Sequence, residues 1–356
     1  MNSKTSQLLV EGWEFQKVDK NSWYQAKVPG CVHLDLLAND LISDPFYRSN
    51  ESKLQWISDG DWTYRLNFQP DSEIFSKKNI EILFLGLNTY ADVYLNGIKI
   101  ICANNMFHPW SAEVKELVKL ESNELIVQFR SPLKEVAVKM ESMDYVLPAD
   151  NDQAGKTSPH SRKAPYQYGW DWGPCLVTSG ICKKVELVAW NDWHISYFQI
   201  NNKKISNENA ELEVELNVIA DNQDVLKITL SELLTGLEFK KKFKVNRGLN
   251  EFCFSIFLEN PKLWWPCGHG DQTLHHFSLK AEINNQLERT KKKLGIRDVK
   301  LKRTKDEKGE SFEIYVNEMP IYSKGANWIP ADYFVERLEI EDYERLLIDA
   351  KRANMN

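Results

Sequence analysis

The sequence predicts a mainly β protein, built from two β-sandwiches followed by a short unit of strands and one helix. Short segments alternate apolar and polar residues, as half-buried strands do. Turn residues separate these segments at the spacing of about ten residues that is typical of sandwiches. Helical periodicity is confined to a few segments. A chain of 356 residues is long enough for two or three domains.

Residues 1–190 are predicted to form the first sandwich, a jelly roll. In Trp62–Phe68 the apolar side chains fall on alternate positions, which places them on one face of a strand. Asn96-Gly97 predicts a tight hairpin, because both positions of a type I′ turn need positive φ. Two helices are expected as exceptions, at 31–39 and 133–143. The polar stretch 148–163 is expected to be a long loop without secondary structure.

Residues 191–297 are predicted to form an immunoglobulin-like sandwich of about seven strands. Glu211, Glu213 and Glu215 alternate with apolar residues, and further strands follow at sandwich spacing. Cys253 has no evident partner across the sheets, so we expect the type without the internal disulfide. The turn Leu263-Trp264-Trp265-Pro266 interrupts the strands, and we interpret it as structural rather than chemical.

Residues 298–356 begin a third unit. A hairpin is expected around Asn317-Glu318-Met319-Pro320, with strands at 312–316 and 321–324. The segment 340–353 has its apolar residues on one face of a helix. These positions are Ile340, Tyr343, Leu346, Leu347, Ala350 and Ala353.

The triplet Trp170-Asp171-Trp172 is the strongest candidate for a functional site. A carboxylate offers two acceptor oxygens, and indoles offer flat apolar faces with one N–H donor each. A sugar presents the complement, with hydroxyls at its edge and C–H groups on its faces. Gly169 and Gly173 flank the triplet and permit the backbone shapes of a loop tip. The alternative from these residues alone is a buried turn whose tryptophans belong to the core.

Several segments, taken in order along the chain, resemble the β-mannosidases of glycoside hydrolase family 2. They are Val28-Pro29-Gly30-Cys31-Val32-His33, Asp44-Pro45-Phe46-Tyr47, Gly86-Leu87-Asn88-Thr89-Tyr90-Ala91, Tyr168-Gly169-Trp170-Asp171-Trp172-Gly173-Pro174 and Lys324-Gly325-Ala326-Asn327-Trp328-Ile329-Pro330. The Trp-Asp-Trp segment is the most specific part of this resemblance. One departure is Cys182, where the family usually has tryptophan.

The resemblance implies a galactose-binding-like jelly roll at 1–190, an immunoglobulin-like sandwich at 191–297 and, at 298–356, the first βα unit of a truncated (β/α)8 barrel. Such a barrel needs roughly 250 residues. The chain is therefore expected to be the N-terminal portion of a retaining exo-β-mannosidase, with both catalytic glutamates beyond Asn356 and no catalytic residue within it. The fragment is expected to be inactive alone.

The resemblance also implies roles for five residues. Asp171 would accept hydroxyls of the sugar in the −1 subsite, and Trp170 and Trp172 would shape the pocket wall. Asn327 and Trp328 are weaker candidates at the mouth of the barrel. The expected partners are a β-mannoside oligosaccharide and the remainder of the catalytic barrel, with no cofactor and no metal.

Two alternatives stay open at this point. Another exo-acting enzyme of family 2, a β-galactosidase, β-glucuronidase or exo-glucosaminidase, shares the domain order. A free-standing carbohydrate-binding module is the alternative outside enzymes. The Trp-Asp-Trp segment disfavours the first alternative, and the partial third unit disfavours the second.

Charge and cysteine content limit the other classes. The net charge is −6 and no basic tract occurs, so nucleic acid and anionic membranes are poor partners. No apolar run approaches the roughly 20 residues of a membrane span. The six cysteines lack metal-ligand spacing and are interpreted as buried free thiols. The polar N-terminus has no signal-peptide core, which slightly favours the cytoplasm and leaves the compartment open.

Overall fold

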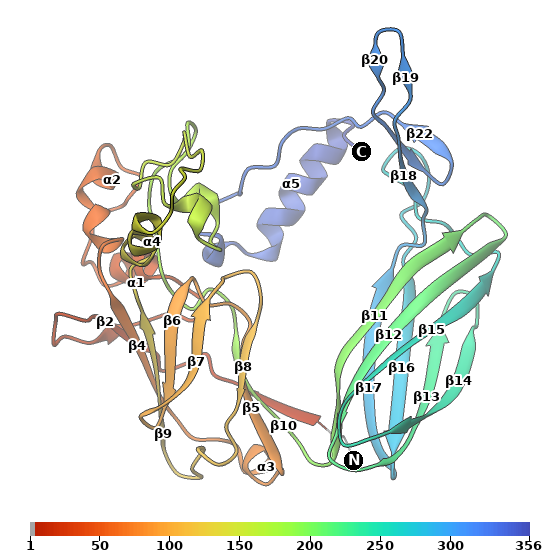
Figure 1. Cartoon of the computed structure of the whole chain (residues 1–356), viewed down its shortest axis with the longest axis horizontal. Helices are drawn as coiled ribbons and strands as arrows, with labels where there is room; N and C mark the ends of the chain where they lie inside the picture. The colour runs from red at the N-terminus through yellow and green to blue at the C-terminus, as the bar shows by residue number, and fades with distance from the viewer. Residues whose placement is uncertain (1–3) are drawn as a thin grey trace. The chain divides into compact units, whose positions relative to one another are not determined.

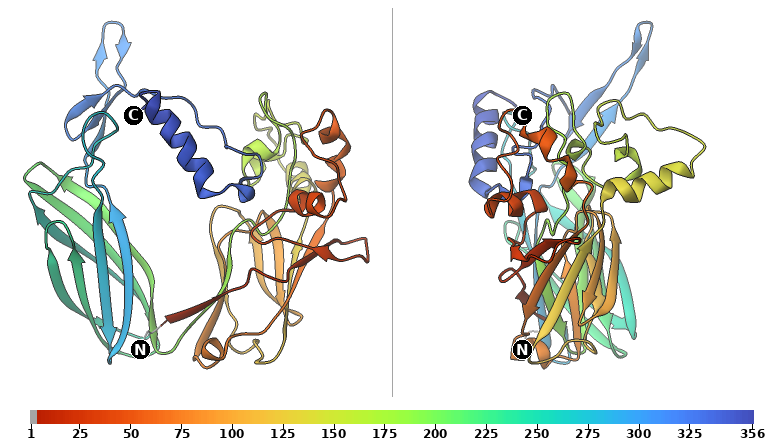
Figure 2. Two further views of the ribbon diagram at one scale, coloured as in Figure 1. Left: turned by 180° about the vertical axis from the view of Figure 1, so that it is seen from behind. Right: turned by 90° about the vertical axis from the view of Figure 1, so that its left-hand side faces the viewer.

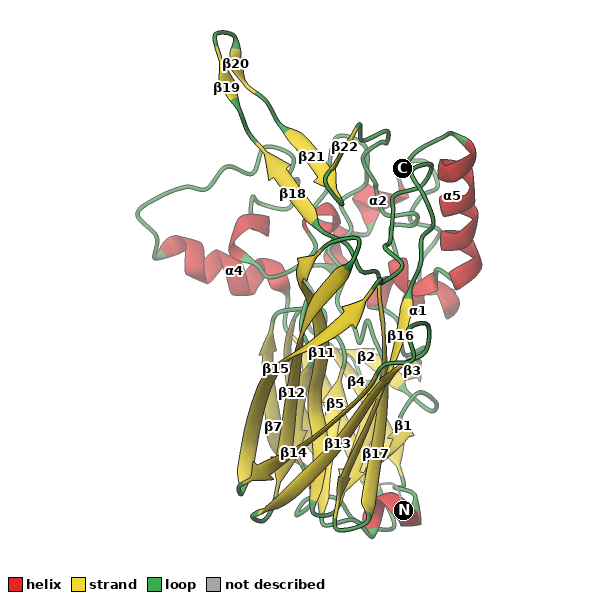
Figure 3. Ribbon diagram, turned by 90° about the vertical axis from the view of Figure 1, so that its right-hand side faces the viewer, coloured by secondary structure: helices red, strands yellow, loops and turns green. Residues whose placement is uncertain are grey.

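The structure is a computed structural model that describes residues 4–356. Strands dominate it (Figure 3). The chain divides into two compact units, and each is described by itself. One holds residues 5–190 and 330–338, and the other holds Lys4, 191–329 and 339–356. None of the described helices is long and apolar enough to cross a membrane.

The first unit contains a sandwich of two sheets (Figure 1). One sheet has the order β1-β10-β5-β8 and the other has the order β3-β2-β4-β9-β6-β7. The strands are β1 (Lys4–Leu8), β2 (Glu14–Lys17), β3 (Tyr24–Gln25), β4 (Trp62–Phe68), β5 (Asn79–Phe84), β6 (Tyr90–Leu95), β7 (Ile98–Asn104), β8 (Trp110–Glu113), β9 (Asn123–Phe129) and β10 (Val185–Trp190). The predicted first sandwich is thus confirmed.

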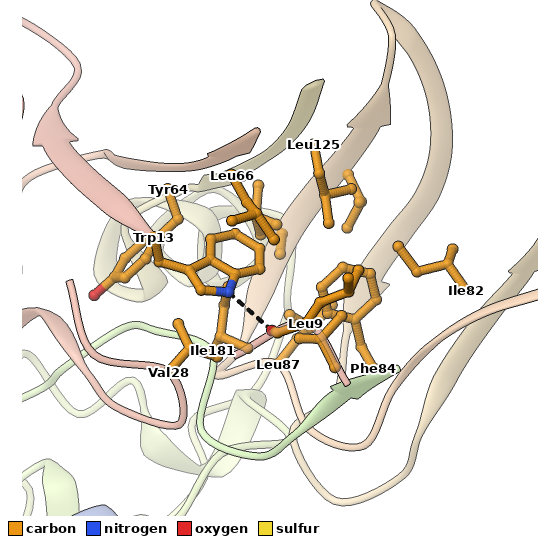
Figure 4. Packing of buried hydrophobic residues seen from close by; sticks show 14 of the residues in the cluster. Leu9, Trp13, Val28, Tyr64, Leu66, Ile82, Phe84, Leu87, Leu125 and Ile181 are labelled. Carbon is orange, nitrogen blue, oxygen red and sulfur yellow. Dashed lines mark hydrogen bonds between the residues drawn. The ribbon is translucent and has the colours of Figure 1, made fainter. Parts of the chain in front are cut away.

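The core of this sandwich lies between the two sheets and is built around Trp13. Its ring is fully buried, and its Nε1 atom donates to the carbonyl of Leu9 at 3.0 Å (Figure 4). The alternation predicted for β4 is confirmed, since Tyr64 and Leu66 are buried in the same core. Losing a tryptophan side chain from such a position costs about 3–5 kcal/mol. Asn96 has positive φ, as the predicted hairpin between β6 and β7 requires.

The helices of this unit are short. They are α1 (Val32–Ala38), α2 (Asn50–Lys53), α3 (Ser72–Phe75) and α4 (Pro132–Glu141), with 3-10 turns η1 (Gln55–Ile57), η2 (Ser158–His160) and η3 (Pro165–Gln167). Helix α4 starts at Ser131, whose side chain accepts from the Lys134 amide while Pro132 occupies the first turn. Figure 2 shows α4 and the loop after it extending to one side of the sheets.

The stretch 148–163 has more local structure than the sequence predicts. Besides η2, it contains a turn held by Asp152. The carboxylate of Asp152 accepts from the amides of Ala154 at 2.6 Å and Ser158 at 2.8 Å. Short polar side chains that bond to nearby backbone amides make such turns without any periodic pattern, which is why the sequence shows only a polar stretch.

The second unit contains a sandwich of seven strands, which confirms the predicted immunoglobulin-like fold. Its sheets have the orders β11-β12-β15 and β14-β13-β16-β17. The strands are β11 (Trp193–Ile205), β12 (Asn209–Ala220), β13 (Asp224–Glu232), β14 (Glu238–Val245), β15 (Gly248–Glu259), β16 (His275–Ile283) and β17 (Gln286–Leu294). Leu212, Val214 and Leu216 point into the core, as the alternating glutamates predict.

The Leu-Trp-Trp-Pro turn has backbone partners of its own. The amide of Trp264 donates to the carbonyl of Ile296 at 2.8 Å, and its carbonyl accepts from the Asn317 side chain at 3.0 Å. The guanidinium of Arg297 lies over the Trp264 ring, 4.6 Å from its centre. These contacts tie the turn to the stretch that follows β17 and to residue Asn317, which fits a structural role.

All six cysteines are free. The expectation that they are buried is wrong for Cys102 and Cys253, which are exposed. Both lie within strands, β7 and β15, at positions that point away from the sandwich core. Side chains alternate across a strand, so a residue type that is usually buried takes the outer face when its position dictates it.

The last elements are short, apart from a helix of 13 residues. They are β18 (Val299–Lys302), β19 (Lys305–Asp306), β20 (Gly309–Glu310), β21 (Glu313–Val316), β22 (Met319–Ile321), η4 (Val335–Arg337) and α5 (Ile340–Arg352). The predicted hairpin is present as β21 and β22, with positive φ at Asn317 and Glu318. Its second strand begins at Met319 rather than Ile321. Helix α5 is confirmed, and its apolar residues Ile340 and Leu347 are exposed.

Candidate functional site

The Trp-Asp-Trp triplet occupies the tip of a loop that follows η3. The amide of Trp170 donates to the carbonyl of Gly173 at 3.3 Å and closes a turn over Asp171 and Trp172. Gly169 precedes the turn with φ of +92°. A Cβ atom at Gly169 would lie 3.0 Å from Cγ of Gln153, so both the backbone angle and the space require glycine.

All three side chains of the triplet are exposed. Trp170 is 37% exposed and Trp172 is 45% exposed, with ring centres 6.2 Å apart and ring planes tilted by 40°. Across residues 4–356, no donor or cation is bonded to the Asp171 carboxylate. The alternative of a buried turn with core tryptophans therefore does not fit this loop. The tip offers two aromatic faces and a free carboxylate to a ligand.

The neck of the loop is held by hydrogen bonds from two other segments. Its limbs meet at a bridge between Tyr168 and Cys175. On one side, Glu51 of α2 accepts from the Cys175 amide at 2.6 Å, and Gln55 of η1 donates to the Cys175 carbonyl at 2.8 Å. On the other side, the Gln153 amide donates to the Tyr168 carbonyl at 2.8 Å. The tip is exposed, but its base is fixed.

A buried polar cluster lies beneath the neck, centred on Lys163. The Lys163 ammonium donates to Oδ1 of Asn88 and, at 2.5 Å, to the carbonyl of Thr178. Asn88 in turn donates from its side-chain amide to Oε1 of Gln167 at 3.3 Å. Burial lowers the pKa of Lys163 to about 7, because the charged form loses its hydration. The cluster connects the segment around Asn88 to the start of the loop.

His33 joins this cluster from α1. Its Nδ1 atom lies 2.9 Å from Oγ1 of Thr178. Burial, and then the nearby charge of Lys163, lower the pKa of His33 to about 3. The imidazole is therefore neutral in the folded protein at neutral pH.

The five residues singled out in the sequence fall in two places. Trp170, Asp171 and Trp172 share the loop tip. Asn327 and Trp328 are exposed in the stretch between β22 and η4 and belong to the other compact unit. The structure places the first three on one loop and the last two in another segment, and the roles of all five stay predictions.

Sequence reasoning missed the residues that hold the loop. Gln55, Gln153 and Tyr333 were not singled out. They bind backbone atoms of the loop, and such contacts leave no spacing or composition signal. Glu51 and Tyr333 lie a few residues after the Asp44–Tyr47 and Lys324–Pro330 motifs. This closeness to a family motif was the one signal that could have pointed to them.

Two protein-family models match the chain. The model described as "Glycosyl hydrolase 2 galactose-binding domain-like" matches residues 13–183, and the model described as "Glycosyl hydrolases family 2" matches residues 193–297. Each range falls on one of the two sandwiches.

Named relatives match nearly the whole chain. "Beta-mannosidase B" of Emericella nidulans is 31% identical over an alignment of 360 residues that covers 97% of this chain. "Beta-mannosidase" of Bos taurus is 31% identical over an alignment of 367 residues that covers 98% of this chain. In both cases the chain spans 41% of the length of the relative.

Solved structures also match nearly the whole chain and less than half of their own length. The β-D-mannosidase of Dictyoglomus thermophilum superposes with a TM-score of 0.92 at 38% identity, over 99% of this chain and 43% of that one. The exo-chitosanase CsxA of Amycolatopsis orientalis superposes with a TM-score of 0.76 at 21% identity, over 99% of this chain and 40% of that one. The second likeness shows the fold alone.

Proposed function

Because this chain belongs to glycoside hydrolase family 2, we propose that it is the N-terminal, non-catalytic part of a retaining exo-β-mannosidase that removes terminal β-linked mannose from oligosaccharides. We divide it into a sugar-binding-like domain at 1–190, an immunoglobulin-like domain at 191–297 and the start of the catalytic barrel at 298–356. The names of the relatives at 31% and 38% identity support this choice within the family.

The observation that carries the proposal is the exposed tip of the Trp-Asp-Trp loop. A carboxylate without an internal partner is free to accept hydrogen bonds from two sugar hydroxyls. Two indole rings beside it offer apolar faces to the C–H side of a pyranose. In the proposed enzyme, Asp171 holds hydroxyls of the terminal mannose in the −1 subsite, and Trp170 and Trp172 form the wall.

The chemistry of bond cleavage lies outside this loop. A retaining glycosidase uses two carboxyl groups about 5–5.5 Å apart, one as nucleophile and one as acid and then base. In our proposal both are glutamates of the catalytic barrel. Asp171 transfers no proton to the leaving group. It accelerates the reaction only as far as its bonds to the sugar are stronger in the transition state than in the ground state.

Two further features support a barrel as the partner of this chain. Ile340 and Leu347 of α5 are apolar and exposed. Exposed apolar residues on one face of a helix are typical of a surface that packs against another part of a protein. Asn327 and Trp328, which we place at the mouth of the barrel, are also exposed. Each is available to a ligand or to another part of the enzyme.

The test is substrate choice by the product of the open reading frame that contains these 356 codons. We expect the p-nitrophenyl β-mannoside to have a higher kcat/KM than the matching β-galactoside, β-glucuronide and β-glucosaminide. A preference for one of the other three sugars would establish the alternative within the family. A reading frame without a barrel, whose product binds mannobiose, would establish a free-standing binding module.

A further inference from the structure

The segment 330–338 comes after the second sandwich in sequence but packs with residues 5–190. Tyr333 and Phe334 in this segment are buried, in a cluster with Cys31 and Leu176. Leu176 is the residue at which the Trp-Asp-Trp loop ends. The segment therefore reaches the first unit at the base of the candidate site.

The hydroxyl of Tyr333 connects the two limbs of the loop at their base. It donates to the carbonyl of Tyr166, 3.1 Å away, and accepts from the amide of Leu176, also 3.1 Å away. A phenol has one proton to donate and lone pairs to accept, so both bonds form together. The Leu176 amide also donates to the Gln167 carbonyl at 3.2 Å, which ties the same limbs directly.

Aromatic contacts fix where the Tyr333 hydroxyl can lie. The ring of Tyr166 meets the Tyr333 ring edge-on, with centres 5.5 Å apart and planes at 89°. Phe46 meets the Tyr333 ring at 6.2 Å. Phe334 stacks on His33 at 5.6 Å. Edge-to-face and offset pairs at these distances are favourable, so the ring has little freedom to move away from the neck.

The same segment also carries a buried carboxyl group, that of Glu336. Both oxygens of Glu336 are buried, and no hydrogen-bond partner for them occurs among the described residues. Burial raises the pKa of Glu336, and the charge of Lys163 acts in the opposite direction. Lys163 also holds the cluster beneath the loop, through its bonds to Asn88 and Thr178.

We propose that Tyr333 is a positioning residue, which sets the height and orientation of the Trp-Asp-Trp tip through its two bonds to the neck. The role of the tip in substrate binding rests on the proposed function. We call the two hydrogen bonds between Tyr333 and the backbone of Tyr166 and Leu176 the clamp. The clamp itself is a property of this chain. Its consequence is that a segment we assign to the start of the barrel shapes a loop of the first domain.

The first experiment needs no substrate. Amide hydrogen exchange is measured on the 356-residue chain, for Tyr333→Phe and for Tyr64→Phe as a control. Tyr64 is also fully buried, and its hydroxyl donates to Asp35 at 2.6 Å rather than to the loop. We expect Tyr333→Phe to speed exchange at the Leu176 amide and across 167–176 by about five- to thirty-fold, as the loss of one or two hydrogen bonds implies. Exchange there in Tyr64→Phe stays as in the parent chain.

The second experiment tests the consequence for catalysis. In the complete enzyme we compare Tyr333→Phe, Asp171→Asn and the double variant. If Tyr333 acts through the loop tip, it lowers kcat/KM by a similar five- to thirty-fold, and most of this loss disappears in the Asp171→Asn background. A purely structural role gives a fall in melting temperature, as in the Tyr64→Phe control, and a loss that simply multiplies that of Asp171→Asn.

The outcomes separate the two proposals. Unchanged exchange at 167–176, or independent effects of the two variants on an active enzyme, overturns the clamp. Faster exchange in Tyr333→Phe together with normal kinetics of Asp171→Asn leaves the clamp in place and overturns the role of the tip in substrate binding.

Discussion

Oε1 of Glu51 accepts a hydrogen bond from the amide of Cys175 at 2.6 Å, across 124 positions of sequence. Glu51 lies in the first turn of the four-residue helix α2, and Cys175 lies in the bridge that closes the neck of the Trp-Asp-Trp loop. A charged acceptor makes a stronger bond to a backbone amide than a neutral one does. This bond therefore fixes one limb of an exposed loop to a helix of the same unit.

We expect Glu51→Ala to lower the free energy of unfolding by about 1–3 kcal/mol, because it leaves a part-buried amide without an acceptor. Glu51→Gln keeps an acceptor oxygen and should lose less. Urea unfolding of the 356-residue chain measures both. Glu116→Ala is the control, since Glu116 is exposed in the same unit. Equal stability of Glu51→Ala and the control would mean that the bond does not hold the neck.

Asp171→Asn in the complete enzyme should lower kcat/KM by roughly ten- to a few-hundred-fold. The variant keeps the shape of the side chain but loses its charge, and charge-assisted bonds are worth about 1.5–3 kcal/mol. Its melting temperature should stay close to that of the parent, because the carboxylate is exposed and has no partner among residues 4–356. Steady-state kinetics and thermal unfolding are measured on one preparation.

Asp144→Asn serves as the matched control for Asp171→Asn, since Asp144 is an exposed aspartate after α4. Its kcat/KM should match that of the parent enzyme. A clear fall in melting temperature with near-normal kinetics of Asp171→Asn would instead assign Asp171 to the support of the fold.

The stability of the chain should depend on His33 between about pH 7 and about pH 5. Its pKa is about 3 in the folded protein and 6.5 in the unfolded chain, so the unfolded chain takes up the proton first. The contribution of His33 is therefore complete above the unfolded pKa and is lost as the pH falls toward the folded one. The loss amounts to about 2 kcal/mol over this interval.

His33→Asn tests this pH dependence, because asparagine keeps a polar atom near Thr178 without a titrating ring. Urea unfolding at several pH values should give a flatter curve for the variant. Other titrating groups, such as Asp35 and His194, are present in both proteins and cancel in the difference. Parallel curves for the two proteins would show that His33 is not buried in its neutral form.

The 356-residue chain alone should release no p-nitrophenol from the aryl β-mannoside. In our proposal both catalytic glutamates belong to the catalytic barrel and not to these 356 residues, and hydrolysis with retention needs both. The measurement compares purified chain with a mock preparation at several protein concentrations. Turnover that scales with protein would place a catalytic pair inside this chain.

The sequence by itself determined the two sandwiches and the last helix. Apolar residues alternate in β4 and β12 because successive side chains of a strand face opposite sides of a sheet. Asn96-Gly97 predicts its hairpin because both residues accept positive φ. The apolar positions of α5 repeat with the helical period. Each of these signals is local, so each is visible in a single sequence.

Only the tertiary structure decided how the Trp-Asp-Trp loop is held. Its three residues were visible as a motif, but whether they were core or exposed was not. The supports are Glu51, Gln55 and Tyr333, which lie between 120 and 167 positions away from the atoms they bind. They bind backbone amides and carbonyls, which every residue of the loop carries whatever its side chain, so the pairing has no counterpart in the sequence of the loop.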